Sequence, residues 1–209
     1  MLSPEETHGP ERGIALLIID MQRDFVLPGA PLCVAGALPS VPVVRRLLDR
    51  ARDRGWPVFH VVREHAPDGG DAEPCRRHLF RAGGGVCVAG TTGAAVVDEL
   101  TPLPGERKLV KTRFSGFYRT SLEDELRALG ISTVLVAGTQ YPNCVRGTAV
   151  DALYRDFRVI VVSDACSAQT PEVAEANIRD MRGMGIVCEP LDRLPELLAR
   201  RERTEEVRR

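Results

Sequence analysis

Residues 134–153 read VLVAGTQYPNCVRGTAVDAL, and this stretch holds the pattern that decides the fold. An apolar run stops at Gly138, a short polar stretch with a proline follows, and helical periodicity begins at Cys144. A strand, a short loop and a helix in this order form the first part of a βαβ unit. The stretch therefore predicts a parallel sheet, with a thiol placed where a helix begins.

The same alternation of apolar runs and helical periods continues along the chain. It predicts an α/β fold with a mostly parallel sheet of about six strands. The strands are expected at residues 14–19, 57–62, 108–111, 133–137, 158–162 and 185–188. Further helices are expected around residues 41–51, 120–129, 172–183 and 195–201.

Several residues mark where these helices should begin and end. Gly55 stands where a left-handed residue commonly closes a helix, and Gly130 closes another. Thr120 and Glu123 have the spacing of a capping box, and Pro171 favours a helix start. These signals predict the connections between the strands.

Length and composition limit the architecture and the partners. The 209 residues are 44% hydrophobic, which suits one domain over 1–209, with 1–12 and 202–209 as flexible tails. The 28 basic and 29 acidic residues nearly balance, and no basic stripe is interleaved with aromatics, so we expect neither a nucleic acid nor a membrane as partner. Without a secretory signal pattern or a long apolar segment, the chain is expected to be cytoplasmic. Its six cysteines form no C-x-x-C pair and are expected to be free thiols.

The least regular region lies at residues 63–93, with the sequence REHAPDGGDAEPCRRHLFRAGGGVCVAGTTG. It is longer than an ordinary connection between elements of an α/β domain. We therefore expect a functional loop or a lid.

Three polar residues stand at or beyond predicted strand ends: Asp20, Lys111 and Cys144. In an open parallel sheet, ligands bind beyond the carboxyl ends of the strands. Each residue also has a structural explanation, since aspartate is common in turns, lysine is commonly solvated, and cysteine is commonly buried. Their position at three different strand ends favours a shared site.

The predicted place of Cys144 at the start of a helix suits a nucleophile. The free N–H groups and the positive end of the helix dipole lower the pKa of a thiol, and a nearby lysine lowers it further. The same N–H groups can hold the oxyanion that forms when a thiolate attacks a carbonyl. A carboxylate such as Asp20 could take the thiol proton and return it to a leaving amine.

Four segments resemble the isochorismatase-like cysteine hydrolases, which include nicotinamidases, N-carbamoylsarcosine amidases and other hydrolases of small amides. The segments are IIDMQRDF (18–25), KTRFSGFYRTSLEDELRALGI (111–131), GTQYPNCVRGTAVDAL (138–153) and VIVVSDACSA (159–168). They follow the family's order and span most of the chain. The resemblance implies a Rossmann-like three-layer α/β/α sandwich and hydrolysis of a C–N bond in a small amide, carbamoyl or ureido compound.

The resemblance also implies a role for each site residue. Asp20 would be the general base and acid, Lys111 the cationic member, and Cys144 the nucleophile that forms a thioester. The family's non-proline cis peptide bond maps to Thr139–Gln140, and its oxyanion hole to the backbone N–H groups of Gln140 and Cys144. A homodimer or homotetramer is implied as well.

The sequence departs from the nicotinamidases after the second predicted strand. Those enzymes carry a metal-binding aspartate and two histidines there, whereas this chain reads VVREHAP at 61–67. We therefore expect no metal and no cofactor. His65 and His78 could belong to the site, although such loop histidines are more often surface residues. True isochorismatases cleave an enol ether and lack the nucleophilic cysteine, so Cys144 favours C–N hydrolysis.

Aromatic walls and a guanidinium suit a small planar acid-amide. The residues expected to bind it are Phe25, Arg63, Arg113, Phe114, Phe117 and Tyr141. The alternative is that the phenylalanines belong to the core or an interface and the arginines to surface ion pairs.

Three other functions stay open at this point. The chain could be an isochorismatase-type hydrolase of another small metabolite. It could be a redox protein with Cys166 as resolving partner of Cys144, although the lack of a C-x-x-C pair speaks against this. It could also be a catalytically silent protein that binds a metabolite, although the presence of all three polar residues speaks against silence.

Overall fold

The structure is a computed structural model that describes residues 13–199. Its centre is a six-stranded sheet in the order β3-β2-β1-β4-β5-β6, and every neighbouring pair is parallel. The strands are β1 (Ile14–Ile19), β2 (Val58–Arg63), β3 (Arg107–Lys111), β4 (Thr133–Thr139), β5 (Arg158–Ser167) and β6 (Val187–Glu189). The helices are α1 (Arg23–Val26), α2 (Ala37–Asp53), α3 (Leu122–Ala128), α4 (Arg146–Leu153) and α5 (Pro171–Gly183).

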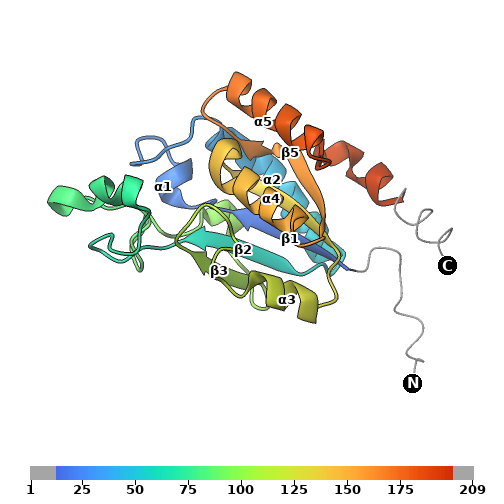
Figure 1. Ribbon diagram of the computed structural model, residues 1–209, viewed down its shortest axis with the longest axis horizontal. Coiled ribbons are helices and arrows are strands. Elements are labelled where there is room, and N and C mark those ends of the chain that lie inside the picture. The colour runs from blue at the N-terminus through green and yellow to red at the C-terminus, as the bar shows by residue number, and fades with distance from the viewer. Residues whose placement is uncertain (1–12, 200–209) are drawn as a thin grey trace.

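Helices cover both faces of the sheet, which confirms the three-layer α/β/α sandwich (Figure 1). One buried cluster joins Leu17 and Ile19 of β1 to α3, α4 and α5. A second cluster joins Leu16 and Ile18 to α2 and to the helical residues 194–199. Alternate residues of a strand face opposite sides, so a strand buried on both faces must be apolar throughout, as β1 is.

The sequence predictions locate all six strands but miss some of their ends. Strand β5 runs to Ser167, five residues beyond the expected end at 162. The last strand begins at Val187 and not at 185, because Gly185 has a positive φ of 91° and closes the turn after α5. Gly55 also has a positive φ, of 65°, directly after the C-cap of α2, as predicted.

The predicted capping box before α3 is wrong by one residue. The N-cap is Ser121, whose Oγ donates to the Glu125 carboxylate at 2.6 Å. Thr120 donates its hydroxyl to the Gly116 carbonyl at 2.5 Å and accepts the Leu122 backbone N–H at 3.3 Å. The predicted residue therefore still binds the first residue of α3, from one position before the N-cap.

The helix predicted to begin at Cys144 begins two residues later in the structure. Residues Tyr141–Val145 form a π-helical turn, η3, and α4 begins only at Arg146. Cys144 therefore lies inside the wider turn before the α-helix. Such π-helical turns often occur at functional sites.

The strand order reverses direction between β1 and β4. Chain connections run outward from β1 through β2 to β3 on one side and from β4 through β5 to β6 on the other. The crevice beyond the carboxyl ends of the two central strands is the usual ligand site of such sheets. Asp20 follows β1 and η3 follows β4, so this crevice lies between predicted site residues.

The long connection from β2 to β3 contains two 3-10 helices, of which the second is η2 (Asp98–Leu100). The 3-10 helix η1 (Pro74–Gly83) projects beyond the end of the sheet, in green in Figure 1. All six cysteines are free thiols. Within residues 13–199, no helix is long and apolar enough to cross a membrane. Of the expected tails, residues 1–12 and 202–209 lie outside the described part, as does the end of the helix expected at 195–201.

Candidate active site

Four neighbouring strands each bring one functional side chain to the same end of the sheet. Lys111 is the last residue of β3 and is in register with Arg63, the last residue of β2. Asp20 directly follows β1, and Cys144 lies in η3 after β4. The parallel strands therefore bring together four residues that are far apart in the sequence.

The lysine and the aspartate form a buried ion pair. Lys111 Nζ donates to Asp20 Oδ2 at 2.7 Å, and both side chains are at most 1% exposed. Lys111 also donates to the Arg113 carbonyl at 3.2 Å. The second carboxylate oxygen, Asp20 Oδ1, is buried and makes no hydrogen bond to any residue in the range 13–199. A buried oxygen without a donor is costly in a structural carboxylate, which indicates a functional one.

Arg63 is the second buried cation of the site. Its Nη2 lies 3.6 Å from Cys144 Sγ, and its Nη1 donates to both carboxylate oxygens of Glu73, at 3.0 and 3.1 Å. The side chain is only 1% exposed. The residue predicted to bind substrate thus contacts the thiol.

Burial and the two neighbouring cations act in opposite directions on the pKa of the thiol. Burial and the negative charge of Asp20 raise the pKa of Cys144, while Lys111 and Arg63 lower it less. The net effect is a raised pKa, opposite to the lowering expected from a helix N-terminus. These surroundings therefore favour the protonated form of the thiol.

The pocket at the thiol is small. Its volume is about 10 Å³, which corresponds to one water molecule. It is lined by Asp20, Phe25, Val34, Arg76, Thr139, Gln140, Asn143 and Cys144. A substrate larger than water therefore requires some of these side chains to move.

The backbone around the predicted oxyanion hole has an unusual geometry. The Thr139–Gln140 peptide bond is cis. The Thr139 hydroxyl accepts a hydrogen bond from Ser167 Oγ at 2.9 Å. Gln140 and Cys144 both line the pocket. The two residues predicted to donate a backbone N–H to the oxyanion therefore lie at the same pocket as the thiol.

The aromatic residues predicted to bind substrate separate into three groups. Phe25 lines the pocket. Phe114 lies over Arg63, with 5.5 Å between the guanidinium carbon and the ring centre. Phe117 and Tyr141 belong to the hydrophobic core, where Phe117 packs on Phe157 and the Tyr141 hydroxyl donates to the Ser163 carbonyl at 2.8 Å. The core packing of Phe117 and Tyr141 favours the structural alternative for these two.

Arg113 faces the loop after β2. Its Nη1 donates to the carbonyl oxygens of Asp71 and Thr112, and its guanidinium lies 5.9 Å from the Tyr118 ring centre. The side chain therefore holds the loop, and it is not among the residues that line the pocket.

Two residues of η1 and its N-cap reach the site without having been predicted. Glu73 anchors Arg63, and Arg76 lines the pocket at the thiol. Their signal in the sequence is the charged segment EPCRRH at 73–78 within the long loop. A charged segment in a loop does not indicate whether a side chain is buried or where it points. Only the fold therefore identifies Glu73 and Arg76 as site residues.

The two histidines considered for the site differ in their surroundings. His65 is 3% exposed, with Nδ1 3.2 Å from Asp71 Oδ1 and Nε2 3.4 Å from Arg63 Nη1. Burial, and next the charge of Arg63, lower its pKa. His78 is exposed. Within residues 13–199, no group of three or more His, Cys, Asp or Glu side chains is arranged to share a metal ion.

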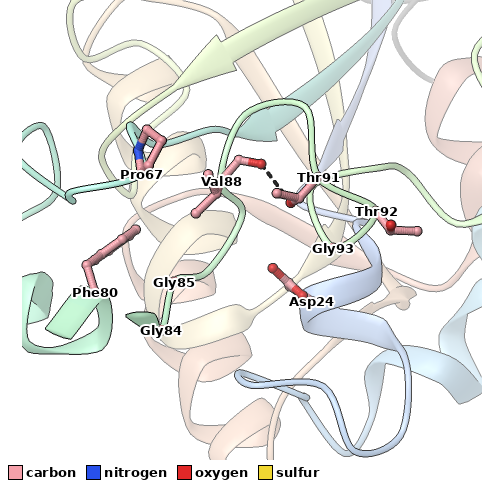
Figure 2. Close-up of a pocket in the computed structure, with 9 residues that line it drawn as sticks. All are labelled: Asp24, Pro67, Phe80, Gly84, Gly85, Val88, Thr91, Thr92 and Gly93. Atoms are coloured by element: carbon pink, nitrogen blue, oxygen red, sulfur yellow. Dashed lines mark hydrogen bonds between the residues drawn. The ribbon is translucent and has the colours of Figure 1, made fainter. Parts of the chain in front are cut away.

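A larger hollow lies elsewhere on the loop. Its volume is about 580 Å³, and Asp24, Phe80 and Val88 are among its lining residues (Figure 2). The Asp24 carboxylate accepts a hydrogen bond from the Cys87 backbone N–H at 2.6 Å, and Thr91 donates its hydroxyl to the Val88 carbonyl at 2.7 Å. Neither Asp20 nor Cys144 lines this hollow, so it is separate from the thiol pocket.

The comparison with known families supports the same assignment. Residues 14–191 match the model of the isochorismatase domain. The chain belongs to the isochorismatase family. The match covers every strand and the four residues at the sheet end.

Several isochorismatase-family relatives are similar over most of their length. A protein of Arabidopsis thaliana named probable inactive nicotinamidase is 44% identical over 90% of this chain and 97% of its own. The maleamate amidohydrolase of Pseudomonas putida is 35% identical over 80% of this chain and 78% of its own. The crystal structure of an isochorismatase family protein from Desulfovibrio vulgaris has a TM-score of 0.89 and 62% identity, covering 90% of this chain and 99% of the other.

Proposed function

We propose that this isochorismatase-family protein is a cysteine-dependent hydrolase that cleaves the C–N bond of a small amide, carbamoyl or ureido compound. The observation that carries the proposal is the buried Lys111–Asp20 pair, with one aspartate oxygen left without a donor, in a pocket that Asp20 shares with Cys144. An acceptor oxygen, a cation and a thiol are the groups that nucleophilic amide hydrolysis requires.

The first half of the reaction forms a thioester. Asp20 takes the Cys144 proton as Sγ attacks the carbonyl carbon, and the C–O double-bond electrons move onto the oxygen. The backbone N–H groups of Gln140 and Cys144 stabilise that oxyanion. When the carbonyl re-forms, the C–N bond breaks, and Asp20 gives its proton to the leaving ammonia or amine.

The second half releases the acid. Asp20 takes a proton from water, whose oxygen attacks the thioester carbon. The C–S bond then breaks, and the proton returns to the Cys144 sulfur. Each proton taken by Asp20 is thus given back within one turnover.

The raised pKa of Cys144 bears on how the thiol is activated. A protonated thiol beside a free carboxylate oxygen favours proton transfer during attack over a thiolate formed beforehand. Lys111 and Arg63 stabilise the negative charge that develops on sulfur, since both lower the pKa of the thiol. We assign Arg63 this role in place of substrate binding.

The relatives support the reaction class but also indicate one competing function. Maleamate amidohydrolase, by its name, hydrolyses a small amide. The relative named probable inactive nicotinamidase favours a catalytically silent fold as the second candidate. In this chain the end of β2 and the segment after it read VVREHAP at 61–67, without the Asp-x-His spacing of the nicotinamidases, so we do not propose nicotinamide as the substrate. A cytoplasmic homodimer or homotetramer remains our prediction for its location and assembly.

The test is ammonia release from a panel of small amides, carbamoyl compounds and ureido acids. Wild type is compared with Cys144→Ala and with Cys188→Ala, which removes another buried thiol, on β6. We expect Cys144→Ala to abolish release and Cys188→Ala to retain it. Release that survives in Cys144→Ala would reject the cysteine mechanism. No release from any compound in the panel would favour the silent fold.

A further inference from the structure

The pocket at the thiol contains one cation that the proposed mechanism does not use. Arg76, on η1, lines the pocket together with Asp20, Gln140 and Cys144. Its guanidinium carbon lies 4.7 Å from the centre of the Phe114 ring. The aromatic face holds the planar group by a cation–π contact and leaves its N–H edges available.

The other arginines near the site each have one Nη group held by protein acceptors, although Arg63 Nε is buried without a partner among the described residues. Arg63 Nη1 is bonded to both oxygens of Glu73, and Arg113 Nη1 is bonded to two backbone carbonyls. For Arg76, no side-chain hydrogen bond or ion pair to another residue of the described part is present. Its N–H edges are therefore the donors that a ligand can use.

The charge balance around the thiol also calls for an anion. Lys111 is paired with Asp20 and Arg63 with Glu73. Arg76 also interacts electrostatically with Glu73, but three cations face two carboxylates here, so the group keeps a net positive charge. Binding a ligand anion would compensate this charge in a site that excludes most water.

We propose that Arg76 binds a carboxylate on the substrate, so that the site selects small amides that also carry an acid group. A planar guanidinium matches a planar carboxylate through two parallel hydrogen bonds, while the amide carbon is presented to Cys144. The assignment rests on the proposed amide hydrolysis for its catalytic meaning. The binding itself can be measured without turnover.

The half-buried position of Arg76 explains how the small pocket can admit such a substrate. Arg76 belongs to a 3-10 helix in the loop and not to the sheet, and it is only partly buried. Asp20 and Cys144, in contrast, are at most 5% exposed. Of the two charged side chains that line the pocket, Arg76 is therefore the one that we expect to shift when a carboxylate enters.

Two alkylating reagents of nearly equal size test the proposal. Iodoacetate carries a carboxylate where iodoacetamide carries a neutral amide, and mass spectrometry resolves the rate at each cysteine. We expect the rate ratio of iodoacetate to iodoacetamide at Cys144 to exceed the ratio at the partly exposed Cys33, which is not adjacent to Arg76 or Arg77 in the sequence, by about tenfold or more. Arg76→Gln should remove most of this preference. Arg77→Gln, which changes an exposed arginine outside the pocket lining, should retain it.

A steady-state comparison completes the test. Arg76→Gln should lower kcat/KM for maleamate by about a hundredfold and for its neutral diamide by much less. An unchanged alkylation ratio in Arg76→Gln would overturn the proposal. If amides are hydrolysed with no preference for an acid group, the proposal fails while the hydrolase function stands. If the Arg76-dependent preference is found but no amide is hydrolysed, carboxylate binding stands and the proposed function fails.

Discussion

At the residue scale, the chemistry depends on how charges are paired around one thiol. Asp20 uses one oxygen for Lys111 and leaves the other without a donor. Arg63 uses one nitrogen for Glu73 and presents the other to Cys144 Sγ at 3.6 Å. Each charged group is thus fixed by one contact and free to act through another.

The pH dependence of alkylation tests the state of the thiol. Because burial and Asp20 raise the pKa of Cys144, its alkylation by iodoacetamide should increase with a midpoint above the ordinary thiol value of about 8.5. Asp20→Asn should shift the midpoint to lower pH, since it removes the negative charge. The same substitution should lower amide hydrolysis by about 10²–10⁴-fold. A midpoint below that of exposed Cys75 in wild type would contradict the raised pKa.

The Arg63–Glu73 pair offers a matched set of variants. Arg63→Met leaves the Glu73 carboxylate in a mostly buried place without its partner, which should cost about 3–5 kcal/mol of unfolding free energy. The double variant Arg63→Met/Glu73→Gln should recover much of this loss. Denaturant unfolding measures both changes.

Alkylation separates the chemical role of this pair from its structural role. Cys144 should be alkylated more slowly than in wild type both in Arg63→Met and in the double variant, because each lacks the cation that lowers the thiol pKa. Recovery of both stability and alkylation rate in the double variant would mean that Arg63 acts only as a structural residue.

At the element scale, the end of β4 depends on a close approach to β1. Gly138 has a φ of 116°, and a Cβ atom there would lie 2.1 Å from the Ile19 carbonyl oxygen. These residues are direct partners in the parallel ladder. The missing side chain lets β4 pass β1 closely just before the Thr139–Gln140 segment and η3, so it determines where Cys144 lies.

Alanine substitutions test this close approach. Gly138→Ala should destabilise the protein by about 3 kcal/mol or more, because the contact involves backbone that cannot move aside and φ is unfavourable for alanine. Gly183→Ala, in the last turn of α5 with open space around it, should be neutral or stabilising by up to about 1 kcal/mol. Thermal or denaturant unfolding of both variants checks the contrast. Equal stability of the two variants would contradict it.

At the scale of the whole molecule, an ionic cluster joins elements at a distance from the thiol pocket. Glu106 accepts hydrogen bonds from Arg52 of α2 at 2.7 Å and from the Leu103 backbone N–H at 2.9 Å, and it contacts His60 of β2 at 2.9 Å. Burial raises the pKa of Glu106, but these contacts outweigh it and hold the pKa at about 2. Burial lowers the pKa of His60, so the neutral imidazole is favoured.

This cluster predicts a loss of stability in acid. The pKa of Glu106 in the folded protein lies below its ordinary value of 4.5. Its contribution to stability is therefore full above pH 4.5 and is lost as the pH falls from 4.5 toward 2. The loss should be on the order of 1–3 kcal/mol. Glu106→Gln should be less stable at neutral pH and show a smaller decrease over this range. Denaturant unfolding at a series of pH values measures it, and parallel curves for the two proteins would exclude the contribution.

Local sequence determined much of this architecture. Strands β1, β4 and β5 contain long apolar runs, and the other three contain shorter ones, so all were found, and the Lys111, Asp20 and Cys144 positions followed from where those runs end. Gly55 closed its helix as predicted because a positive φ is a local property of one residue. The motifs around these positions also indicated the family, which the domain match confirmed.

Tertiary structure alone decided how the site is completed. Glu73 and Arg76 lie in an irregular loop, where neither periodicity nor strand ends predict direction, and their contacts exist only because η1 projects over the sheet end. The state of Cys144 was also a tertiary property: a helix start predicts a lowered thiol pKa, but burial and a carboxylate from another strand raise it. Sequence patterns report the local backbone, whereas desolvation and the pairing of charges depend on which distant segments the fold brings together.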